Sequence, residues 1–188
     1  TVFGFVIVAV VYATSYISGS HINPAVTISY WATGRMHAGT AAYYIMSQMA
    51  GAVMAAYFLK ILFPDAVSTV YLGTCTLGEG VVFWKAALIE CVVTFLFVFT
   101  IYATAVDKRT SKLLAGVAIG LVFPFGVSVS TTISGGALNP VRVFGPAVVS
   151  DHFDYHYVWW VGPVSGAVAA GFLYGKVFKQ KSEEKKLL

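Results

Sequence analysis

The sequence predicts an all-α membrane protein whose two similar halves are inserted in opposite directions. Three observations predict this fold class: an apolar composition, five long apolar segments, and an eight-residue motif that occurs twice. Of the 188 residues, 58% are hydrophobic and 11% are charged, with a mean hydropathy of +0.78. Soluble domains are about 45–50% apolar and about 25% charged, so the excess must face lipid. This composition excludes a disordered chain, a basic nucleic-acid binder and an ordinary water-soluble enzyme.

Five segments are apolar enough to cross a bilayer as helices, and they are too continuously apolar to alternate as barrel strands. The expected spans are 1–16, 37–63, 82–104, 113–130 and 157–178. The first is short, because sixteen residues at 1.5 Å each reach roughly 24 Å of an approximately 30 Å core.

The charged residues predict the orientation of these spans. If each span crosses once, nine of the twelve Lys and Arg lie on one side of the membrane. These are Arg35, Lys108, Arg109, Lys112, Lys176, Lys179, Lys181, Lys185 and Lys186. The opposite loops carry Asp65, Glu79, Asp151 and Asp154. Basic loops stay in the cytoplasm, so the tail 179–188 and the C-terminus are expected there.

The repeated motif lies at 17–24 and again at 133–140, with five of eight positions identical. Each copy follows an apolar span and precedes about ten mostly apolar residues, which are too few to cross. Three crossings separate the copies, so the copies approach the membrane from opposite faces. This is the arrangement of an inverted repeat.

Both copies end in Asn-Pro, which is a strong signal for the start of a helix. Asn caps a first turn with its side-chain oxygen, and Pro suits the first helical position. Asn23-Pro24 and Asn139-Pro140 therefore predict half-helices at 24–32 and 140–149. Entering from opposite faces, their positive ends would meet near the midplane, with both Asn amides directed into the space between them.

These residues resemble the two signature boxes of the aquaporin (major intrinsic protein) family. The first box is 21–27, His-Ile-Asn-Pro-Ala-Val-Thr, and the second is Asn139-Pro140-Val141-Arg142. The stretches 102–105 and 160–163 are most similar to the plant tonoplast-type branch. The resemblance implies six spans, two half-helices and a homotetramer with one pore per subunit. It also implies that the first helix is missing from this chain, which opens on Thr1 within an apolar stretch.

The resemblance assigns a pore motif and a selectivity region. The pore motif comprises Asn23, Pro24, Ala25, Asn139, Pro140 and Val141, where Val141 replaces the family's usual Ala. Arg142 is the functional candidate on physical grounds too, since an Arg at membrane depth is costly. The resemblance adds Phe3, Val127 and Gly136 as its neighbours. Gly136 stands where mercury-blocked relatives have Cys, so insensitivity to mercurials is expected.

Two further polar residues stand at membrane depth. Glu90 is the acid inside a span, and it either accepts hydrogen bonds from a re-entrant loop or relays protons. No other titratable partner lies in the spans, which favours the first reading, and the resemblance implies the same. His21 is expected to brace its loop, with a pH gate as the alternative.

These observations predict a passive channel for water that also admits small neutral solutes such as hydrogen peroxide, ammonia or urea. Protons and ions would be excluded. The alternatives are a non-conducting structural membrane protein and a glycerol-type facilitator. The sequence holds no catalytic triad, metal-ligand cluster or phosphate loop, so no enzyme activity, cofactor, metal or nucleic-acid partner is expected. The resemblance places the protein in a vacuolar, other intracellular or plasma membrane.

Overall fold

A computed structural model describes residues 2–110 and 112–184, and every regular element in those ranges is helical. The helices are α1 (Val2–Ser18), α2 (Pro24–Ala32), α3 (Ala38–Leu62), α4 (Ala66–Val70), α5 (Phe83–Ile101), α6 (Ala115–Ser134), α7 (Pro140–Ser150) and α8 (Val158–Glu184). A 3₁₀ turn follows α4 at Tyr71–Gly73, a π-helical turn continues α5 at Tyr102–Val106, and another 3₁₀ turn precedes α6 at Lys112–Leu114. The expected cytoplasmic tail, 179–188, lies partly in α8, and its residues 185–188 lie outside the described residues.

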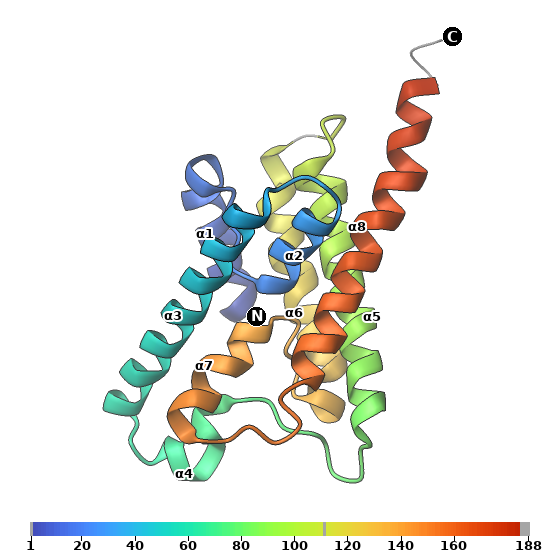
Figure 1. The fold of residues 1–188 in the computed structure, drawn as a ribbon. Coiled ribbons are helices and arrows are strands. Elements are labelled where there is room, and N and C mark those ends of the chain that lie inside the picture. The colour runs from blue at the N-terminus through green and yellow to red at the C-terminus, as the bar shows by residue number, and fades with distance from the viewer. Residues whose placement is uncertain (1, 111, 185–188) are drawn as a thin grey trace.

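Within the residues that the structure describes, four helices are long and apolar enough to cross a membrane: Ala38–Leu62, Phe83–Val106, Ala115–Ser134 and Val158–Phe178. The apolar α1 is shorter, at 17 residues. The remaining two apolar helices, α2 and α7, have 9 and 11 residues and cannot span a bilayer. Both begin near the middle of the molecule and run toward opposite ends (Figure 1).

The packing follows the internal repeat. The half-helix α7 packs against α3, and α2 packs against α8 in the equivalent way, while α1 and α6 pack against each other. The two half-helices therefore exchange positions under a pseudo-two-fold axis, as an inverted repeat requires. The structure confirms the predicted fold class.

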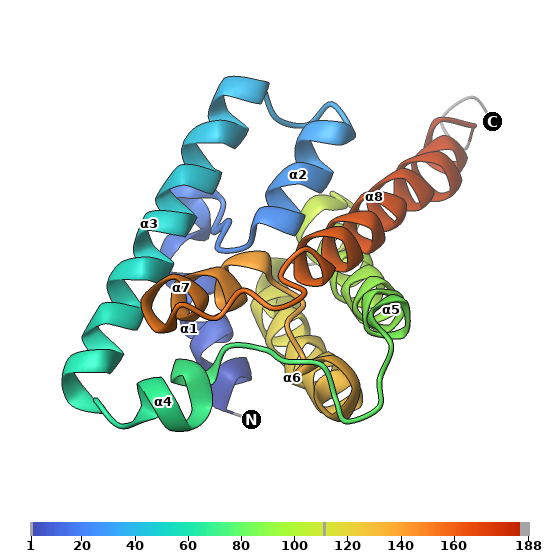
Figure 2. The ribbon, with the colours of Figure 1, turned by 60° about the horizontal axis from the view of Figure 1, so that its bottom comes forward.

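The two long outer helices differ in how far they are covered. Helix α8 packs along α5, which also contacts α6, whereas α3 stands on the opposite side of the molecule (Figures 1 and 2). Only 6% of the most apolar stretch of α3 is buried among the described residues, against 44% for α5. The surface of α3 is accordingly free for lipid or for another helix.

Close packing of α8 on α5 depends on glycine. A Cβ at Gly166 would collide with the Cys91 carbonyl, and one at Gly162 would lie 2.7 Å from the Ala87 carbonyl oxygen. Small residues allow helices to approach in this way within a membrane. A Cβ added to Gly175, one turn beyond Gly171, would meet no atom within 4 Å.

The ends of the bundle carry opposite charge. The connection from α2 to α3, which contains Arg35, and the connection from α5 to α6, which contains Lys108 and Arg109, lie toward the end where α8 finishes, which we call the basic end. Asp65, Glu79, Asp151 and Asp154 lie in the loops of the other end, which we call the acidic end.

Candidate functional site

The two half-helices start with nearly identical caps. Asn23 and Asn139 have extended backbones, with φ/ψ of −146°/121° and −145°/113°. The Asn23 side-chain oxygen accepts the Ala25 N–H at 2.9 Å, and that of Asn139 accepts the Val141 N–H at 3.2 Å. Proline occupies the first helical turn in both, where a missing N–H costs nothing.

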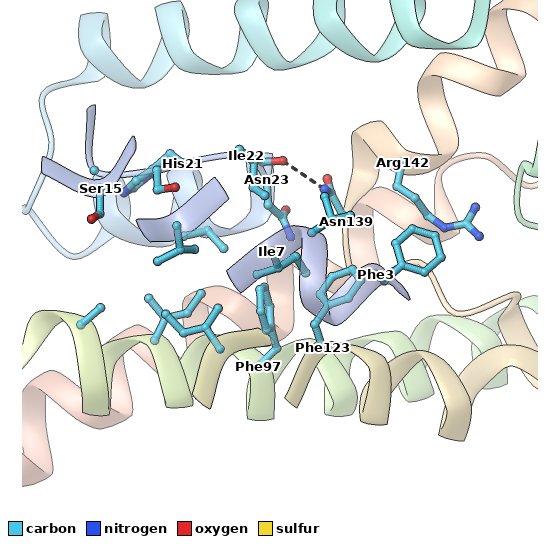
Figure 3. A pocket seen from close by; sticks show the side chains of 18 of the residues that line it. Phe3, Ile7, Ser15, His21, Ile22, Asn23, Phe97, Phe123, Asn139 and Arg142 are labelled. Atoms are coloured by element: carbon cyan, nitrogen blue, oxygen red, sulfur yellow. Dashed lines mark hydrogen bonds between the residues drawn. The ribbon is translucent and has the colours of Figure 1, made fainter. Parts of the chain in front are cut away.

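The amide groups of the two caps join the loops to each other. Asn23 Nδ2 donates to the Leu138 carbonyl at 2.8 Å. Asn139 Nδ2 donates to the Ile22 carbonyl at 3.1 Å, the bond drawn in Figure 3. The expectation that both amides are directed into the space between the half-helices did not name these carbonyls, each of which takes one amide N–H. Because an amide nitrogen carries two protons, each Asn retains one N–H beyond this bond.

Left-handed backbone brings the loop carbonyls to these positions. Ser20 and Leu138 have φ of 58° and 52°, and Gly19, Gly135 and Gly136 also have positive φ. Non-glycine residues seldom adopt this region unless surrounding contacts hold them there. The Gly/Ser stretch before each Asn-Pro therefore supplies the turn that lets the loops meet. Val141, whose larger side chain is expected to affect this approach, is buried at 5% exposure.

A cavity of about 240 Å³ lies beside the paired caps. Asn23, Asn139, Phe3 and Arg142 line it (Figure 3). The remaining wall is mostly apolar and includes Ile7, Phe97, Ile101, Ile119 and Phe123. A few polar groups set in an apolar cavity are typical of a site that handles small molecules.

A second, more open cavity of about 450 Å³ lies between the loops and α3. It shares His21, Ile22, Asn139 and Arg142 with the first cavity. The four shared residues therefore form a partition that is exposed on both sides among the described residues.

Arg142 lies in the first turn of α7, at the edge of the first cavity. Its Nη1 donates to the Gly73 carbonyl at 2.6 Å, and its guanidinium carbon lies 6.0 Å from the centroid of the Phe3 ring. Within the described ranges, the ion pair found is Arg109 with Asp107, so Arg142 is held by a neutral carbonyl. A guanidinium held in this way keeps its charge unneutralised next to the cavity.

Val127 and Gly136, the other two residues expected in the selectivity region, lie against each other. A Cβ on Gly136 would be 2.8 Å from the Val127 carbonyl oxygen and 3.0 Å from its Cγ1. Neither residue lines the cavity that contains Phe3 and Arg142. The structure therefore shows two separate pairs, Phe3 with Arg142 and Val127 with Gly136, and the shared role of the four in selectivity stays a prediction.

Glu90 is fully buried and its carboxylate reaches the loop before α7. One oxygen accepts from Ser134 Oγ at 2.6 Å and from the Ala137 N–H at 2.8 Å, and the other accepts the Leu138 N–H at 2.8 Å. Leu138 is the residue whose carbonyl receives the Asn23 amide. Glu90 thus makes the contacts that a loop brace requires.

His21 lies within the first loop itself, at the position that corresponds to Ala137 in the repeat. Its Nδ1 lies 3.3 Å from Thr27 Oγ1, and its ring packs on Tyr30 at 4.5 Å between centroids. Gln48 of α3 donates to the His21 carbonyl at 2.7 Å and to Thr27 Oγ1 at 3.0 Å. The sequence analysis missed Gln48, although an amide inside an apolar span is a signal that could have identified it.

The sequence analysis also missed the segment 71–75, which holds Arg142 and α7 from the acidic end. Thr74 Oγ1 donates to the Val143 carbonyl at 3.0 Å, and Cys75 Sγ contacts the Gly135 carbonyl at 3.4 Å. Cys75 is 2% exposed, and burial raises the pKa of its thiol to about 12. No local sequence signal marks these contacts, since their partners lie far along the chain.

Comparison with known proteins gives one family and one fold. The sequence matches the Major intrinsic protein family over residues 1–174. It is 38% identical to aquaporin TIP2-1 of Arabidopsis thaliana, covering 96% of this chain and 71% of that protein. It is 37% identical to aquaporin-4 of Rattus norvegicus, covering 99% of this chain and 58% of that protein, so it spans less than two thirds of that relative.

A solved structure shares this architecture. The aquaglyceroporin of Plasmodium falciparum superposes with a TM-score of 0.81, covering 93% of this chain and 79% of that one. The sequence identity is 22%, so this likeness concerns the fold.

Proposed function

Because the chain belongs to the major intrinsic protein family, we propose that it is a passive transmembrane channel for water, with small neutral solutes as secondary cargo. One observation carries the proposal. Two half-helices from opposite ends meet through Asn23 and Asn139, and both residues line a cavity that Arg142 also lines. A protein that only packs in a membrane has no need of polar groups at this depth.

Water would be passed by the free donors along this cavity. Each Asn has one N–H beyond its bond to the opposite loop, and these two donors can orient a passing water oxygen. The remaining wall is mostly apolar and offers few competing partners, which allows a molecule to leave as readily as it enters.

Ion exclusion follows from the sign of the local charge. The positive ends of α2 and α7 meet at the caps, and the unneutralised Arg142 lies one turn away. All three raise the potential that a cation or proton must cross, while a neutral molecule feels little of it.

A second candidate is a facilitator that favours glycerol-type solutes over water. The observation that favours it is the Val127–Gly136 pair, since both residues are small and neither adds a side-chain donor to the narrow region. Phe3 and Arg142 favour water, because a ring and a guanidinium together leave a narrower passage. We place water first on this balance.

Stopped-flow measurements on proteoliposomes of the complete protein test the proposal. We expect water flux well above that of protein-free vesicles, weaker urea flux and the least glycerol flux. Val127→His should lower the urea flux while the water flux is largely kept. Arg142→Ala should raise the urea flux. Val129→His, on an exposed face of the same helix, is the matched control. Glycerol flux that rivals water flux would establish the second candidate, and no flux would make the protein structural.

The chain is an integral membrane protein, and we propose that its basic end faces the cytoplasm, in a vacuolar, other intracellular or plasma membrane. The charge difference between the two ends supports this orientation. We also propose a homotetramer, which native mass spectrometry in detergent would detect. Labelling of a cysteine introduced at Asp154 from outside intact cells or vesicles tests the orientation.

A further inference from the structure

The acidic end carries an aromatic pair that nothing above has given a function. The ring of Tyr71 stacks on the imidazole of His152, with centroids 3.9 Å apart and planes 10° from parallel. Tyr71 belongs to the turn after α4, and His152 lies just beyond the C-terminus of α7. We propose that this pair is a positioning device that holds the Gly73 carbonyl against Arg142 and so sets the solute selectivity. The proposal rests on the channel function proposed above.

The backbone between the stacked pair and Arg142 has an unusual conformation. Tyr71, Leu72 and Gly73 are successive left-handed residues, with φ of 48°, 53° and 77°. Two of them are not glycine, and such residues keep this conformation where surrounding contacts impose it. The Gly73 carbonyl, which accepts the Arg142 guanidinium at 2.6 Å, is presented by this turn.

Contacts on either side of the turn impose this left-handed conformation. Leu72 is buried in a small cluster with Ala56 of α3 and Val149 of α7. The stacking on His152 fixes Tyr71, the residue before Leu72. The hydrogen bond from Arg142 fixes Gly73, the residue after Leu72. The turn is therefore held at three successive residues, and its partners include both ends of α7.

The turn also links the two ends of α7. Arg142 and His152 are ten residues apart, which is about 15 Å along a helix. The turn contacts α7 near its start through Gly73 and beyond its end through Tyr71. The His152 N–H bonds to the Ala147 carbonyl at 3.1 Å, so His152 moves with the last turn of the helix. Loss of the pair would loosen the Gly73 carbonyl and hence the guanidinium, while the buried Leu72 and the hydrogen bond from Thr74 to the Val143 carbonyl would still restrain the turn in part.

Release of Arg142 has a direct consequence for selectivity. The guanidinium faces Phe3 across 6.0 Å, and no acidic partner holds it among the described residues. Without the Gly73 carbonyl it would sample other rotamers, and the gap to Phe3 would no longer be fixed. Solute flux would then rise relative to water flux, in the direction expected of Arg142→Ala but to a smaller extent.

The experiment compares the ratio of urea to water permeability in proteoliposomes of the complete protein. Tyr71→Ala and His152→Ala should each raise the ratio by about two- to tenfold, the factor that corresponds to losing one stacked aromatic pair. His152→Phe keeps an aromatic ring and should restore the wild-type ratio. The double alanine variant should match a single variant, because both remove the same contact. Tyr155→Ala is the control, since its ring stacks on Phe83 at the same end without touching the turn.

A second readout does not depend on conduction. Hydrogen exchange of amides 72–76 should accelerate in His152→Ala and in Arg142→Ala but not in Tyr155→Ala. A wild-type protein without water flux would overturn the channel function. Hydrogen exchange of amides 72–76 would still test whether the Tyr71–His152 pair holds the turn. Unchanged ratios and unchanged exchange in both alanine variants would overturn the positioning role. Equal effects from Tyr155→Ala would overturn it too.

Discussion

Replacing Glu90 by Gln should loosen the loop that leads into α7, because this change removes the charge and one acceptor with little change of volume. The carboxylate accepts three hydrogen bonds, from the Ser134 hydroxyl and from the N–H groups of Ala137 and Leu138. An amide presents a single oxygen. If that oxygen keeps the Ser134 and Ala137 bonds, the new NH₂ group faces the Leu138 N–H, donor against donor.

The size of the effect follows from that count. A buried N–H left without an acceptor costs about 1–3 kcal/mol. The hydrogen bonds that remain are no longer made to a charged group, and their strength is roughly halved. We therefore expect the free energy of unfolding to fall by about 2–4 kcal/mol. Water permeability should fall with it, since the Leu138 carbonyl also receives the Asn23 amide.

Titration with SDS in mixed micelles measures the free energy of unfolding of both proteins. Glu79→Gln makes the same chemical change at an exposed position in a loop and should leave it unchanged. A Glu90→Gln protein as stable as wild type would refute the reasoning, because it would show that the three bonds contribute nothing net. A loss as large in Glu79→Gln would refute it as well.

Three further predictions follow from other parts of the fold. Gly166→Ala should destabilise the protein by about 1–3 kcal/mol in the same titration, because its Cβ would strike the Cys91 carbonyl; stability equal to wild type would contradict this. Mercuric chloride should leave water flux unchanged, since Cys75 is buried with its pKa raised to about 12 and Cys91 lies in α5 where Gly166 of α8 packs against it; block that disappears in Cys75→Ser or in Cys91→Ser would contradict this. Hydrogen bonds from Arg109 hold the pKa of Asp107 well below its usual range, so the wild type should be more stable than Asp107→Asn at neutral pH and lose that advantage as the pH falls below about 4; thermal unfolding from pH 7 to pH 3 that shows a constant difference would contradict this.

The inverted architecture was predictable because its signal is local and occurs twice. Asn23-Pro24 and Asn139-Pro140 each specify a helix start by their own chemistry, and the structure confirms the resulting fold class. The number of crossings between the copies then determined their opposed directions. No contact between distant residues was needed for either inference.

The contacts that hold the site were less predictable, because they join residues that are remote in the sequence. Gly73 accepts from Arg142 across 69 positions, and the Asn23 amide donates across 115. The sequence analysis directed both Asn amides into the space between the half-helices without naming a partner, while the structure uses one proton of each to join the loops. Gln48 was missed because its partners, His21 and Thr27, are defined only once α3 is placed.

The measurement that tests the channel most directly compares water flux and proton flux in the same proteoliposomes. Stopped-flow light scattering gives the water permeability, and a pH-sensitive dye inside the vesicles gives the proton flux under an imposed gradient. The paired half-helix ends and the unneutralised Arg142 predict water permeability well above that of protein-free vesicles, with proton flux no greater than theirs. Proton flux that rises together with water permeability, or water permeability equal to that of protein-free vesicles, would contradict the account.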